Sequence, residues 1–577
     1  MNIQNDKELT GYPSIDKPWL KYYSEETIQC KLEPNTIYGY LWDSNKEQGD
    51  DVALIYFKKT ITYRMLFGQI EQCARSLTAL GVKAGDIVTI QTLAIPQTVV
   101  LLYALSRVGA VANLIYVSST ESEVNHFLKH TESRLYFVLS RIYEQFSSVL
   151  EETNVERVVL LSLDTEMDFG TRFVYHLTSR QKKSHAFENA IFWNAFMQLV
   201  PDHYSDAPMD AERPVVMVYT GGTSGVPKAV VLTNHSINSL VFQYKKGEMG
   251  FVRQSVFMNS LPPFIAFGLT VSLHLPLCMG VKTVLIPNPS TGNAAKQFLK
   301  YKPNYYVAGP MQIEAIFNQL KAKKMNFSFL KILATGGDAL PATKERYINE
   351  LLKMCKCETS VIQGYGMTEL AATVCTGKPD LIHFGTVGIP LPDTNVKIID
   401  MESGSELGYG QQGELCIMAP SVMLGYYKEE TETFRILKKH KDGQYWIHTG
   451  DIGTIDEDGF LTIIGRIKRI IYTVEDAVYH KVFPKLLEER FEKIAGVESV
   501  IVVGNSIYPE KCKLVAFCVT GSGHLVTETE LKTFATENFS SYERPVEYRF
   551  VSEFPQTKLG KVDFRTLERE AQKEIEC

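Results

Sequence analysis

The stretch that decides the fold reads Tyr219-Thr220-Gly221-Gly222-Thr223-Ser224-Gly225-Val226-Pro227-Lys228. Short apolar runs flank it, at 215–218 and 229–232, and such runs next to turn residues are typical of buried strands. Glycines let several backbone N–H groups point into one concavity, and such a nest binds anions. The hydroxyl groups add donors, and the lysine adds a positive charge. The sequence therefore predicts a strand, a phosphate-binding loop and a second strand.

This stretch has two other interpretations, the P-loop of NTPases and a plain hairpin turn. The P-loop of NTPases has the pattern G-x-x-x-x-G-K-[ST], which does not fit here. A plain glycine-rich hairpin turn needs only one or two special residues, whereas this stretch has a dense run of donors that ends in Pro-Lys. The composition of the loop favours phosphate binding.

Strands alternate with helices on both sides of this loop. Gly81 and Gly109 each follow a helical pattern, as C-cap glycines do. Strands that alternate with helices of ten to fifteen residues favour a parallel, layered α/β fold. Residues 164–212 are polar and are expected to form an irregular surface excursion. The expected strands are 52–56, 59–63, 87–90, 112–117, 135–139, 158–163, 282–286, 305–309 and 331–335, and the expected helices are 65–80, 96–108, 122–130, 235–244, 269–278 and 310–320.

The chain is long enough for several folding units. At about 150 residues per domain, 577 residues suggest three or four units. A β-rich part is expected in the second half, with strands at 395–400, 413–418, 453–455 and 459–465. A boundary near Lys468 leaves a compact βα pattern large enough for its own domain. We expect an α/β fold with a large N-terminal domain, 1–467, that has several subdomains, and a small mobile α+β domain, 468–577.

Composition excludes several classes of protein. The net charge of −6 argues against a general nucleic-acid binder. The start of the chain lacks the apolar core of a signal peptide, and no apolar stretch approaches the ~18 residues of a membrane span. The cysteines are scattered, and neither Cys355 and Cys357 nor His126 and His130 have the further ligands of a metal motif. We expect reduced thiols and a cytoplasmic location.

Four further clusters combine glycine with chemically active side chains. Tyr365 could stack on a planar base, and Glu369 offers the oxygen ligand that Mg²⁺ prefers. Asp451 follows an expected tight turn and suits the hydroxyls of a ribose. Each cluster alone also fits a plain turn or a solvated side chain. The clusters are Gln363-Gly364-Tyr365-Gly366-Met367-Thr368-Glu369, Tyr445-Trp446-Ile447-His448-Thr449-Gly450-Asp451, Gly465-Arg466-Ile467-Lys468 and Thr557-Lys558-Leu559-Gly560-Lys561-Val562-Asp563.

In order and spacing, the five clusters resemble those of the adenylate-forming (AMP-binding) superfamily. That superfamily comprises acyl- and aryl-CoA synthetases, peptide-synthetase adenylation domains and luciferases, and the chain is closest in character to the acyl- and aryl-CoA synthetases. The resemblance runs from about residue 50 to residue 565 and includes the segments 80–86, 109–111, 385–390 and 413–415. It implies that a carboxylate attacks the α-phosphate of MgATP to give an acyl-adenylate and pyrophosphate. A thiol, most often that of CoA, then takes the acyl group.

The resemblance also implies a role for individual residues. Lys561 is expected to bridge the carboxylate and phosphate in the first step, with Lys228, Thr368 and Glu369 as further catalytic residues, and Lys468 to act as the hinge. Glu369 and Thr223 are expected to hold Mg²⁺. The expected ATP-binding residues are Thr220, Gly221, Gly222, Thr223, Ser224, Gly225 and Lys228 at the phosphates, Gly336, Gly337, Asp338, Gly364, Tyr365, Gly366, Met367 and Thr368 around the adenine and phosphates, Asp451 and Arg466 at the ribose, and Lys561.

The acid pocket is expected around the segment 263–268. Amino-acid-activating relatives place an Asp where this chain has Ile265, and a buried substrate ammonium without such a partner is costly. This favours a fatty or aromatic acid, although the same residues could be ordinary core. The expected pocket residues are Phe264, Ile265, Phe267, Gly309, Gly337 and Gly364.

The thiol acceptor is less well defined by the sequence. Many relatives have a pair of glycines after the hinge, but residues 470–481 contain none. Glu475 and Asp476 in that stretch would disfavour the phosphates of CoA. We expect an acyl-CoA synthetase whose substrates are a fatty or aromatic carboxylic acid, ATP and CoA. The alternatives are an adenylation enzyme that loads a carrier-protein thiol and a catalytically silent nucleotide-binding module. A homodimer is one option for its assembly.

Overall fold

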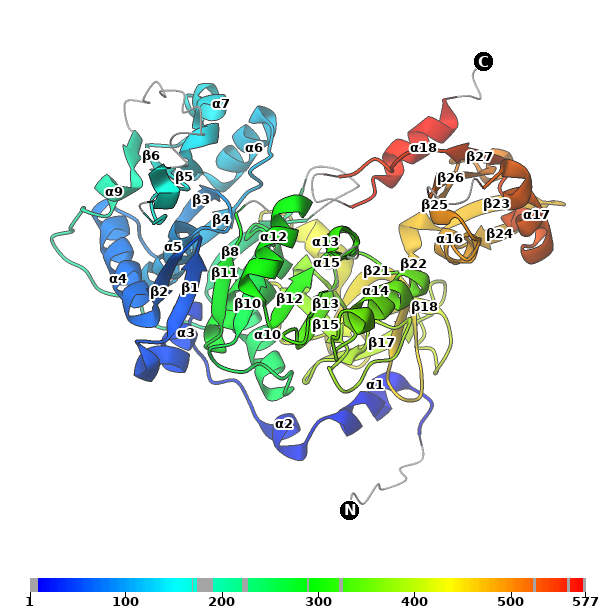
Figure 1. Cartoon of the computed structure of the whole chain (residues 1–577), viewed down its shortest axis with the longest axis horizontal. Helices are drawn as coiled ribbons and strands as arrows, with labels where there is room; N and C mark the ends of the chain where they lie inside the picture. Colours follow the sequence, from blue (N-terminus) through cyan, green and yellow to red (C-terminus); the bar gives the residue numbers. More distant parts are fainter. Residues whose placement is uncertain are drawn as a thin grey trace.

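The computed structural model describes residues 9–168, 170–173, 190–220, 227–287, 290–320, 325–521, 526–557 and 561–573. Two large sheets with helices packed on them form most of the molecule, a β-rich part adjoins them, and the last hundred or so residues form a smaller unit at the upper right of Figure 1. The predicted class, α/β with a large N-terminal part and a small C-terminal one, is confirmed.

The first large sheet is mostly parallel and contains nine strands. Its helices α12 (Thr291–Tyr301), α13 (Pro310–Leu320) and α14 (Ala342–Met354) pack on it through a core that includes Phe298, Phe317 and Leu352. In spatial order the strands are β16 (Ile389–Pro390), β15 (Ala372–Thr376), β14 (Val361–Met367), β13 (Ile332–Thr335), β12 (Tyr305–Ala308), β10 (Val256–Asn259), β11 (Lys282–Leu285), β1 (Val52–Tyr56) and β2 (Lys59–Thr62).

The second large sheet has eight strands and carries the predicted phosphate loop. Helix α5 (Pro96–Val108) is buried along its whole length except at Arg107, and it ends at Gly109 with φ 75°, as predicted. The other helices are α4 (Tyr63–Ala79), α6 (Glu121–Thr131), α7 (Ser140–Leu150) and α10 (Asn234–Lys246). In order the strands are β19 (Gly425–Tyr426), β9 (Ala229–Thr233), β8 (Pro214–Tyr219), β4 (Val111–Leu114), β3 (Ile87–Gln91), β5 (Leu135–Leu139), β6 (Arg157–Leu161) and β7 (Ala190–Phe192).

The predicted irregular excursion at 164–212 is wrong in part. Strand β7 extends the second sheet, and α9 (Trp193–Phe196) buries Trp193 and Phe196 against Phe137. Polar residues flank these two core aromatics in the sequence, so the surrounding pattern does not indicate a buried element.

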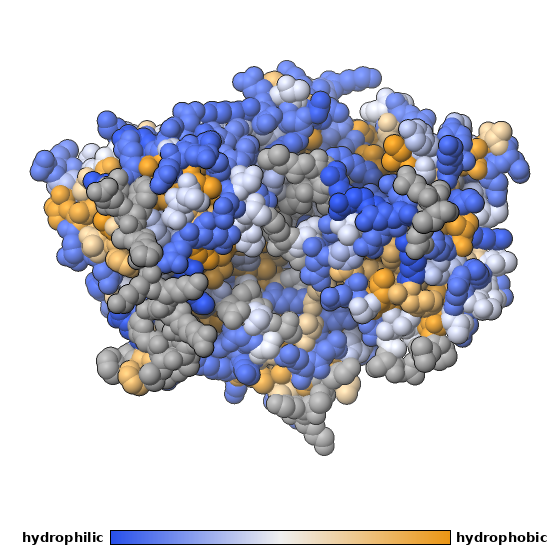
Figure 2. All heavy atoms as spheres, turned by 90° about the horizontal axis from the view of Figure 1, so that it is seen from above, coloured by the Kyte–Doolittle hydropathy of each residue, from blue (hydrophilic) through white to orange (hydrophobic). Residues whose placement is uncertain are grey.

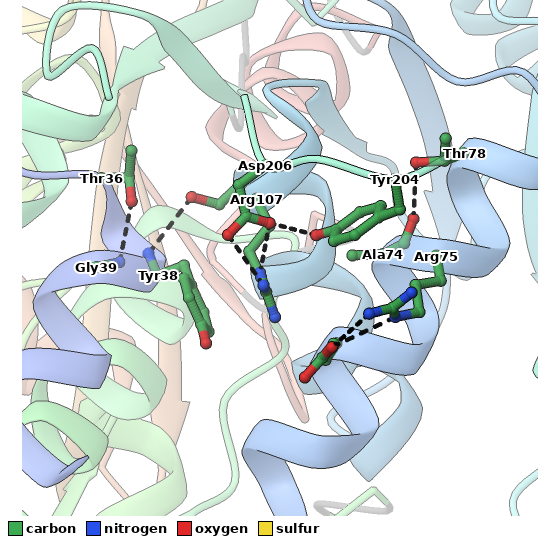
Figure 3. A network of polar contacts seen from close by, with 11 residues as sticks. Thr36, Tyr38, Gly39, Ala74, Arg75, Thr78, Arg107, Tyr204 and Asp206 are labelled. Carbon is green, nitrogen blue, oxygen red and sulfur yellow. Dashed lines mark hydrogen bonds and ion pairs between the residues drawn. The ribbon is translucent and has the colours of Figure 1, made fainter. Parts of the chain in front are cut away.

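The end of the same segment is tied to α5. The two oxygens of Asp206 accept hydrogen bonds from Nε and Nη2 of Arg107, both at 2.9 Å (Figure 3). The ring of Tyr204 lies between Arg75 and Arg107, whose guanidinium carbons are 5.1 and 5.8 Å from its centroid. These contacts hold residues 204–207 against α5 before the chain continues to β8.

The β-rich part is an antiparallel sheet, as predicted for the second half. Its strands are β17 (Asn395–Ile399), β18 (Gly413–Met418), β21 (Tyr445–Ile455) and β20 (Leu437–Lys439), and β22 (Leu461–Arg466) pairs with β21. The expected tight turn before Asp451 is wrong, because β21 continues through it. Gly450 has φ 69°, which a side chain would disfavour, and the pairing of β21 with β18 shifts register between His448 and Ile452, across this glycine.

The small C-terminal unit has cores of its own, built from residues between 471 and 571. The stretch without glycines after the hinge forms a hairpin of β23 (Ile471–Glu475) and β24 (Val478–Val482). A three-stranded sheet of β25 (Val497–Gly504), β26 (Leu514–Thr520) and β27 (Glu547–Phe550) is flanked by α16 (Pro484–Phe491), α17 (Glu528–Asn538) and α18 (Phe564–Gln572). The boundary at Lys468 stays a prediction.

The lead-in segment runs along the large part at the bottom of Figure 1, through α1 (Pro13–Asp16), α2 (Glu25–Gln29) and α3 (Ile37–Asn45). Trp19 within it is fully buried. Among the residues that the structure describes, no helix combines the length and apolar character that crossing a bilayer requires. The face seen in Figure 2 is mainly hydrophilic, and its hydrophobic residues lie in several separate groups.

Candidate active site

The predicted phosphate loop connects two paired strands. Tyr219 at the end of β8 pairs with Ala229 at the start of β9. Thr220 closes the base of the loop, because its N–H donates to the carbonyl of Lys228 at 3.0 Å and its Oγ1 accepts from the Lys228 N–H at 3.1 Å. Gly221, Gly222, Thr223, Ser224 and Gly225 lie outside the described residues, so their predicted phosphate contacts stay predictions.

Lys228 already has an acidic partner. Its Nζ donates to Glu432 of α15 (Glu430–Ile436), which also pairs with Arg435, and it lies 5.1 Å from the ring centroid of Tyr426. The hydrogen bond from Lys228 lowers the pKa of Glu432. Phosphates that bind Lys228 would therefore have to replace Glu432.

Glu369, the predicted Mg²⁺ ligand, is buried directly after β14. It lies in a 3-10 turn, Thr368–Leu370, and only 7% of its surface is exposed. Its Oε1 accepts a hydrogen bond from the hydroxyl of Tyr426 at 2.6 Å. Burial raises the pKa of Glu369, and the hydrogen bond opposes that shift. Tyr426 thus connects the predicted metal ligand to the neighbourhood of Lys228.

Tyr365, Asp451 and Arg466 form one polar group between two sheets. The Tyr365 hydroxyl donates to Asp451 Oδ2 at 2.6 Å, and Arg466 Nε is 2.8 Å from Asp451 Oδ1. Asp451 and Arg466 are direct partners across β21 and β22. Burial raises the pKa of Asp451, while Arg466 and Tyr365 lower it, and the carboxylate in turn raises the pKa of Arg466.

The close contact between β14 and β15 explains why residue 366, in the cluster 363–369, is a glycine. A Cβ on Gly366 would lie 1.6 Å from the carbonyl oxygen of Ala372, so any side chain there would push the strands apart. Tyr365 therefore sits in a strand with a register shift beside it and not in a turn.

An apolar cavity of about 130 Å³ lies beside these groups. Part of its wall is the π-helical segment Phe267–His274, which replaces the first part of the α-helix expected at 269–278. Such π-helical turns are frequent at functional sites. Among the described residues that line the cavity, Lys561 is the only one with a charge.

Lys561 reaches this cavity from the small C-terminal unit. Its backbone is tied to Thr557, whose N–H donates to the Lys561 carbonyl at 2.7 Å. Part of Lys561 is open to solvent, yet the surrounding protein lowers the pKa of its ammonium by desolvation. Asp338 and Asp451 act in the opposite direction. The expected hinge, Lys468, lies in the 3-10 turn Ile467–Arg469 between the two units.

The structure brings most of the predicted site residues together. Those that line the cavity are Ile265, Phe267, Gly336, Gly337, Gly364, Tyr365, Gly366, Met367, Thr368 and Lys561. Phe264 and Gly309 are not among the lining residues, and Phe264 instead packs edge-on against Tyr116 with centroids 5.3 Å apart.

Sequence reasoning missed several residues of the site. Tyr244, Met249 and Phe251 line the cavity, but Tyr244 lies near the end of α10 and the other two just after it, where no motif marks them. Tyr426 and Glu432 contact predicted site residues across more than 50 positions of sequence, and no local pattern marks them.

Family models match both units. The model of the AMP-binding enzyme matches residues 41–427, and that of the AMP-binding enzyme C-terminal domain matches residues 486–561. The chain belongs to the AMP-binding enzyme family. The resemblance expected from the five clusters is thereby confirmed.

Curated relatives of this AMP-binding enzyme match along nearly its whole length. The long-chain-fatty-acid–CoA ligase of Salmonella typhimurium is 28% identical over 97% of this chain and 100% of its own. The ligase of the same name from Bacillus subtilis is 26% identical over 96% and 97%. A probable 4-coumarate–CoA ligase 1 of Dictyostelium discoideum is 28% identical over 85% and 87%.

Solved structures share the fold of this AMP-binding enzyme. ATP-bound MatB from Rhodopseudomonas palustris superposes with a TM-score of 0.80 and 21% identity, covering 94% of this chain and 100% of its own. The anthranilate CoA ligase AuaEII with anthranoyl-AMP gives 0.79 and 20%, covering 95% and 99%.

Proposed function

We propose that this AMP-binding enzyme activates an apolar carboxylic acid with ATP and transfers the acyl group to CoA. The observation that carries the proposal is the apolar cavity whose one charged lining residue, within the described part of the chain, is Lys561. An apolar acid has one anionic end and an uncharged body, and this wall complements both. The curated relatives named as CoA ligases support the same reaction.

The first step joins two anions, so positive charge must offset their repulsion. The acid places its carboxylate at Lys561, and one oxygen attacks the α-phosphorus while the bond to pyrophosphate breaks. Lys561 stabilises the negative charge that develops there. Lys228, released from Glu432, holds the leaving phosphates together with the loop 220–228. Tyr365 stacks on the adenine, and Asp451 and Arg466 hold the ribose.

Glu369 fits the role of a magnesium ligand. A carboxylate oxygen is a hard ligand of the kind Mg²⁺ prefers, and Tyr426 orients it by a hydrogen bond to Oε1. Thr223 is the second proposed ligand. Bound Mg²⁺ would neutralise phosphate charge in the first step.

The second step needs a different face of the small unit. The thiolate of CoA attacks the acyl carbon and AMP leaves. Lys561 occupies the cavity in the present arrangement, so we propose that the small unit turns about Lys468 to admit the thiol. The β23–β24 hairpin would then approach the acceptor.

The acid is proposed to be fatty or aromatic. Ile265 lines the cavity, and no carboxylate is among the described lining residues to pair with an amino acid's ammonium. Relatives named for a long-chain fatty acid and for 4-coumarate match at similar identity, so they favour neither class over the other.

The test is acid-dependent exchange of labelled pyrophosphate into ATP with a panel of fatty, aryl and amino acids. We expect exchange with fatty or aryl acids and none with amino acids. Absence of exchange with every acid would reject the proposal and favour the silent nucleotide-binding module.

A second assay identifies the acceptor. We expect a free CoA thioester with each acid that supports exchange. Exchange without thioester would favour the carrier-protein alternative, which Glu475 and Asp476 in the hairpin support on grounds of charge. The cytoplasmic location and the homodimer expected from the sequence stay predictions.

A further inference from the structure

Three metal-ligating side chains meet in the β-rich sheet, away from the cavity wall. Cys416 Sγ, a ring nitrogen of His440 and a ring nitrogen of His448 all lie within 4.8 Å of one another. Cys416 lies on β18 and His448 on β21, and the two residues are direct cross-strand partners. His440 follows β20, which pairs with the other edge of β21. Two neighbouring strands and the loop after a third therefore supply the three donors.

The orientation of the two imidazoles leaves their Nε2 atoms facing one another. The Nε2 atoms of His440 and His448 are 2.9 Å apart. His448 Nδ1 lies 2.9 Å from Glu414 Oε2, and because a carboxylate only accepts, Nδ1 carries the proton. With that tautomer, the Nε2 lone pair of His448 accepts the hydrogen bond from Nε2–H of His440.

A carboxylate behind a ligating histidine is the usual support of a metal centre. It fixes the tautomer and the ring plane and makes the other nitrogen a stronger ligand. Glu414 does this for His448, and both of its oxygens are engaged, since Oε1 accepts the Gly450 N–H at 3.1 Å. Through this hydrogen bond, Glu414 also contacts the backbone at Gly450, one residue before Asp451.

The cluster is largely shielded from solvent and has charges of both signs around it. Cys416 is fully buried, and 11% of the His448 side chain and 14% of the Glu414 side chain are exposed. Lys397 and Lys438 are the nearby positive charges. The ammonium of Lys397 is directed to Asp442 at 3.0 Å and to the Trp446 ring at 3.9 Å, and Glu414 adds a negative charge beside the histidines.

We infer that Cys416, His440 and His448 form a zinc-class metal site, with Glu414 as the carboxylate behind His448. One thiolate and two neutral imidazoles are ligands that Zn²⁺ prefers, and a tetrahedral ion keeps its fourth position for water. Binding releases the thiol proton of Cys416, and the His440 proton moves from Nε2 to Nδ1. The ion would clamp β18, the end of β20 and β21 together near Asp451.

The test is a titration of the chelator-treated full chain with Co²⁺, which reports ligands by absorption. We expect one tight Co²⁺ per chain with a thiolate-to-cobalt charge-transfer band, displaced by Zn²⁺. Cys416→Ser should remove the band. The matched control is Cys518→Ser, a buried cysteine of β26, which should keep it. Absence of the band in the wild type, or its survival in C416S, would overturn the assignment.

Two further variants keep the test decisive if C416S fails to fold. His440 lies in a loop outside the strands, so His440→Gln should fold and bind Co²⁺ at least tenfold more weakly. Glu414→Gln keeps all three ligands, and removal of such a carboxylate lowers metal affinity by about 10- to 100-fold. His235→Gln, a half-buried histidine elsewhere, is the control. Unchanged affinity in H440Q would contradict the site, because a hydrogen-bonded His–His pair without metal would then explain the geometry.

Discussion

The proposed role of Lys561 depends on charged groups that lie outside its own segment of the chain. The Lys561 backbone is hydrogen-bonded to Thr557 of the small unit, whereas the carboxylates that act on it, Asp338 and Asp451, belong to the large one. Desolvation lowers the pKa of its ammonium, and the two carboxylates raise it. The result is a cation at the wall of an apolar cavity, where it can interact with the anionic end of an acid.

Replacement of Lys561 by Ala should therefore impair the first step selectively. Loss of one preorganised charge donor costs about 10²- to 10³-fold in rate, and we expect that loss in pyrophosphate exchange. Thioester formation from supplied acyl-adenylate should stay within a few fold of wild type. Lys532→Ala, which removes a half-exposed lysine of α17, is the control. Exchange at the wild-type rate in K561A would refute the role.

Glu432 should act as a competitor of the nucleotide. Its carboxylate pairs with Lys228 while both side chains are partly exposed, at 22% and 36%. Such pairs are worth about 0.2–1 kcal/mol, so Glu432→Gln should tighten ATP binding by up to about fivefold. The measurement is the Kd for ATP by calorimetry, with Glu430→Gln on the same helix as control. Weaker ATP binding in E432Q would show that Glu432 assists the nucleotide.

At the scale of elements, local signals predicted boundaries best where a cap residue marks them. The structure reproduces α5, α13 and β5 at the residues expected from the sequence, and Gly109 ends α5. The hairpin of β23 and β24 was not predicted, because its turn contains no glycine. Asp476 and Ala477 have φ of 50° and 63°, values at which glycine or asparagine is usual. The pairing of the flanking strands stabilises that turn, together with contacts such as the hydrogen bond from Ser541 Oγ to Glu475 at 2.6 Å.

The end of helix α16 should make stability depend on pH. Glu492, its C-cap, is half-buried next to Ser499 and near Lys344, and desolvation raises its pKa to about 7. The folded state therefore holds this proton more tightly than the unfolded state, whose pKa is near 4.5. Stability is lost as pH rises from about 4.5 to about 7 and stays constant above, with a total of up to about 3 kcal/mol.

Glu492→Gln should remove this dependence. The gain in melting temperature over wild type should be larger at pH 8 than at pH 5. Glu489→Gln, at an exposed site on the same helix, should show no such change between the two pH values. An equal gain for E492Q at both pH values would mean that the carboxyl is ionised in the folded state throughout.

At the scale of the whole molecule, the polar contacts between the small unit and the large one include those of two lysines, within the part of the chain that the structure describes. Lys481 of the hairpin lies 2.6 Å from Glu402, and Lys485 donates to the carbonyl of Ile463 at 2.6 Å. The Lys481–Glu402 pair is largely exposed and contributes little to stability. A weakly held unit suits a domain that must turn between two half-reactions.

Lys468→Pro should therefore separate the two steps. Proline fixes φ and disfavours the helical conformation of the preceding residue, Ile467, which begins the 3-10 turn. We expect pyrophosphate exchange within about threefold of wild type and thioester formation at least tenfold slower, as for a gating step. Lys468→Ala is the control, since it removes the charge but keeps the backbone free. A full rate of thioester formation in K468P would exclude a hinge there.

The sequence alone predicted neither the order of strands in the two sheets nor the contacts between site residues that are distant along the chain. Pattern and capping predicted the class and most elements of the N-terminal half. The contacts of Tyr426 with Glu369 and of Glu432 with Lys228 depend on the packing of separate sheets, which local patterns do not encode. The family resemblance implied the roles of individual residues. The structure showed the cavity and the one lysine among its described lining residues.

The place of β1 in the first sheet has a consequence for biosynthesis. Strand β1 ends at Tyr56, but its parallel partner β11 begins at Lys282, about 226 residues later. A ribosome that adds about 5–20 residues per second needs roughly 10–50 s to produce that partner. During this interval the apolar residues of β1 and β2 emerge without their sheet. The nascent chain should accordingly depend on chaperones until residue 285 has left the exit tunnel.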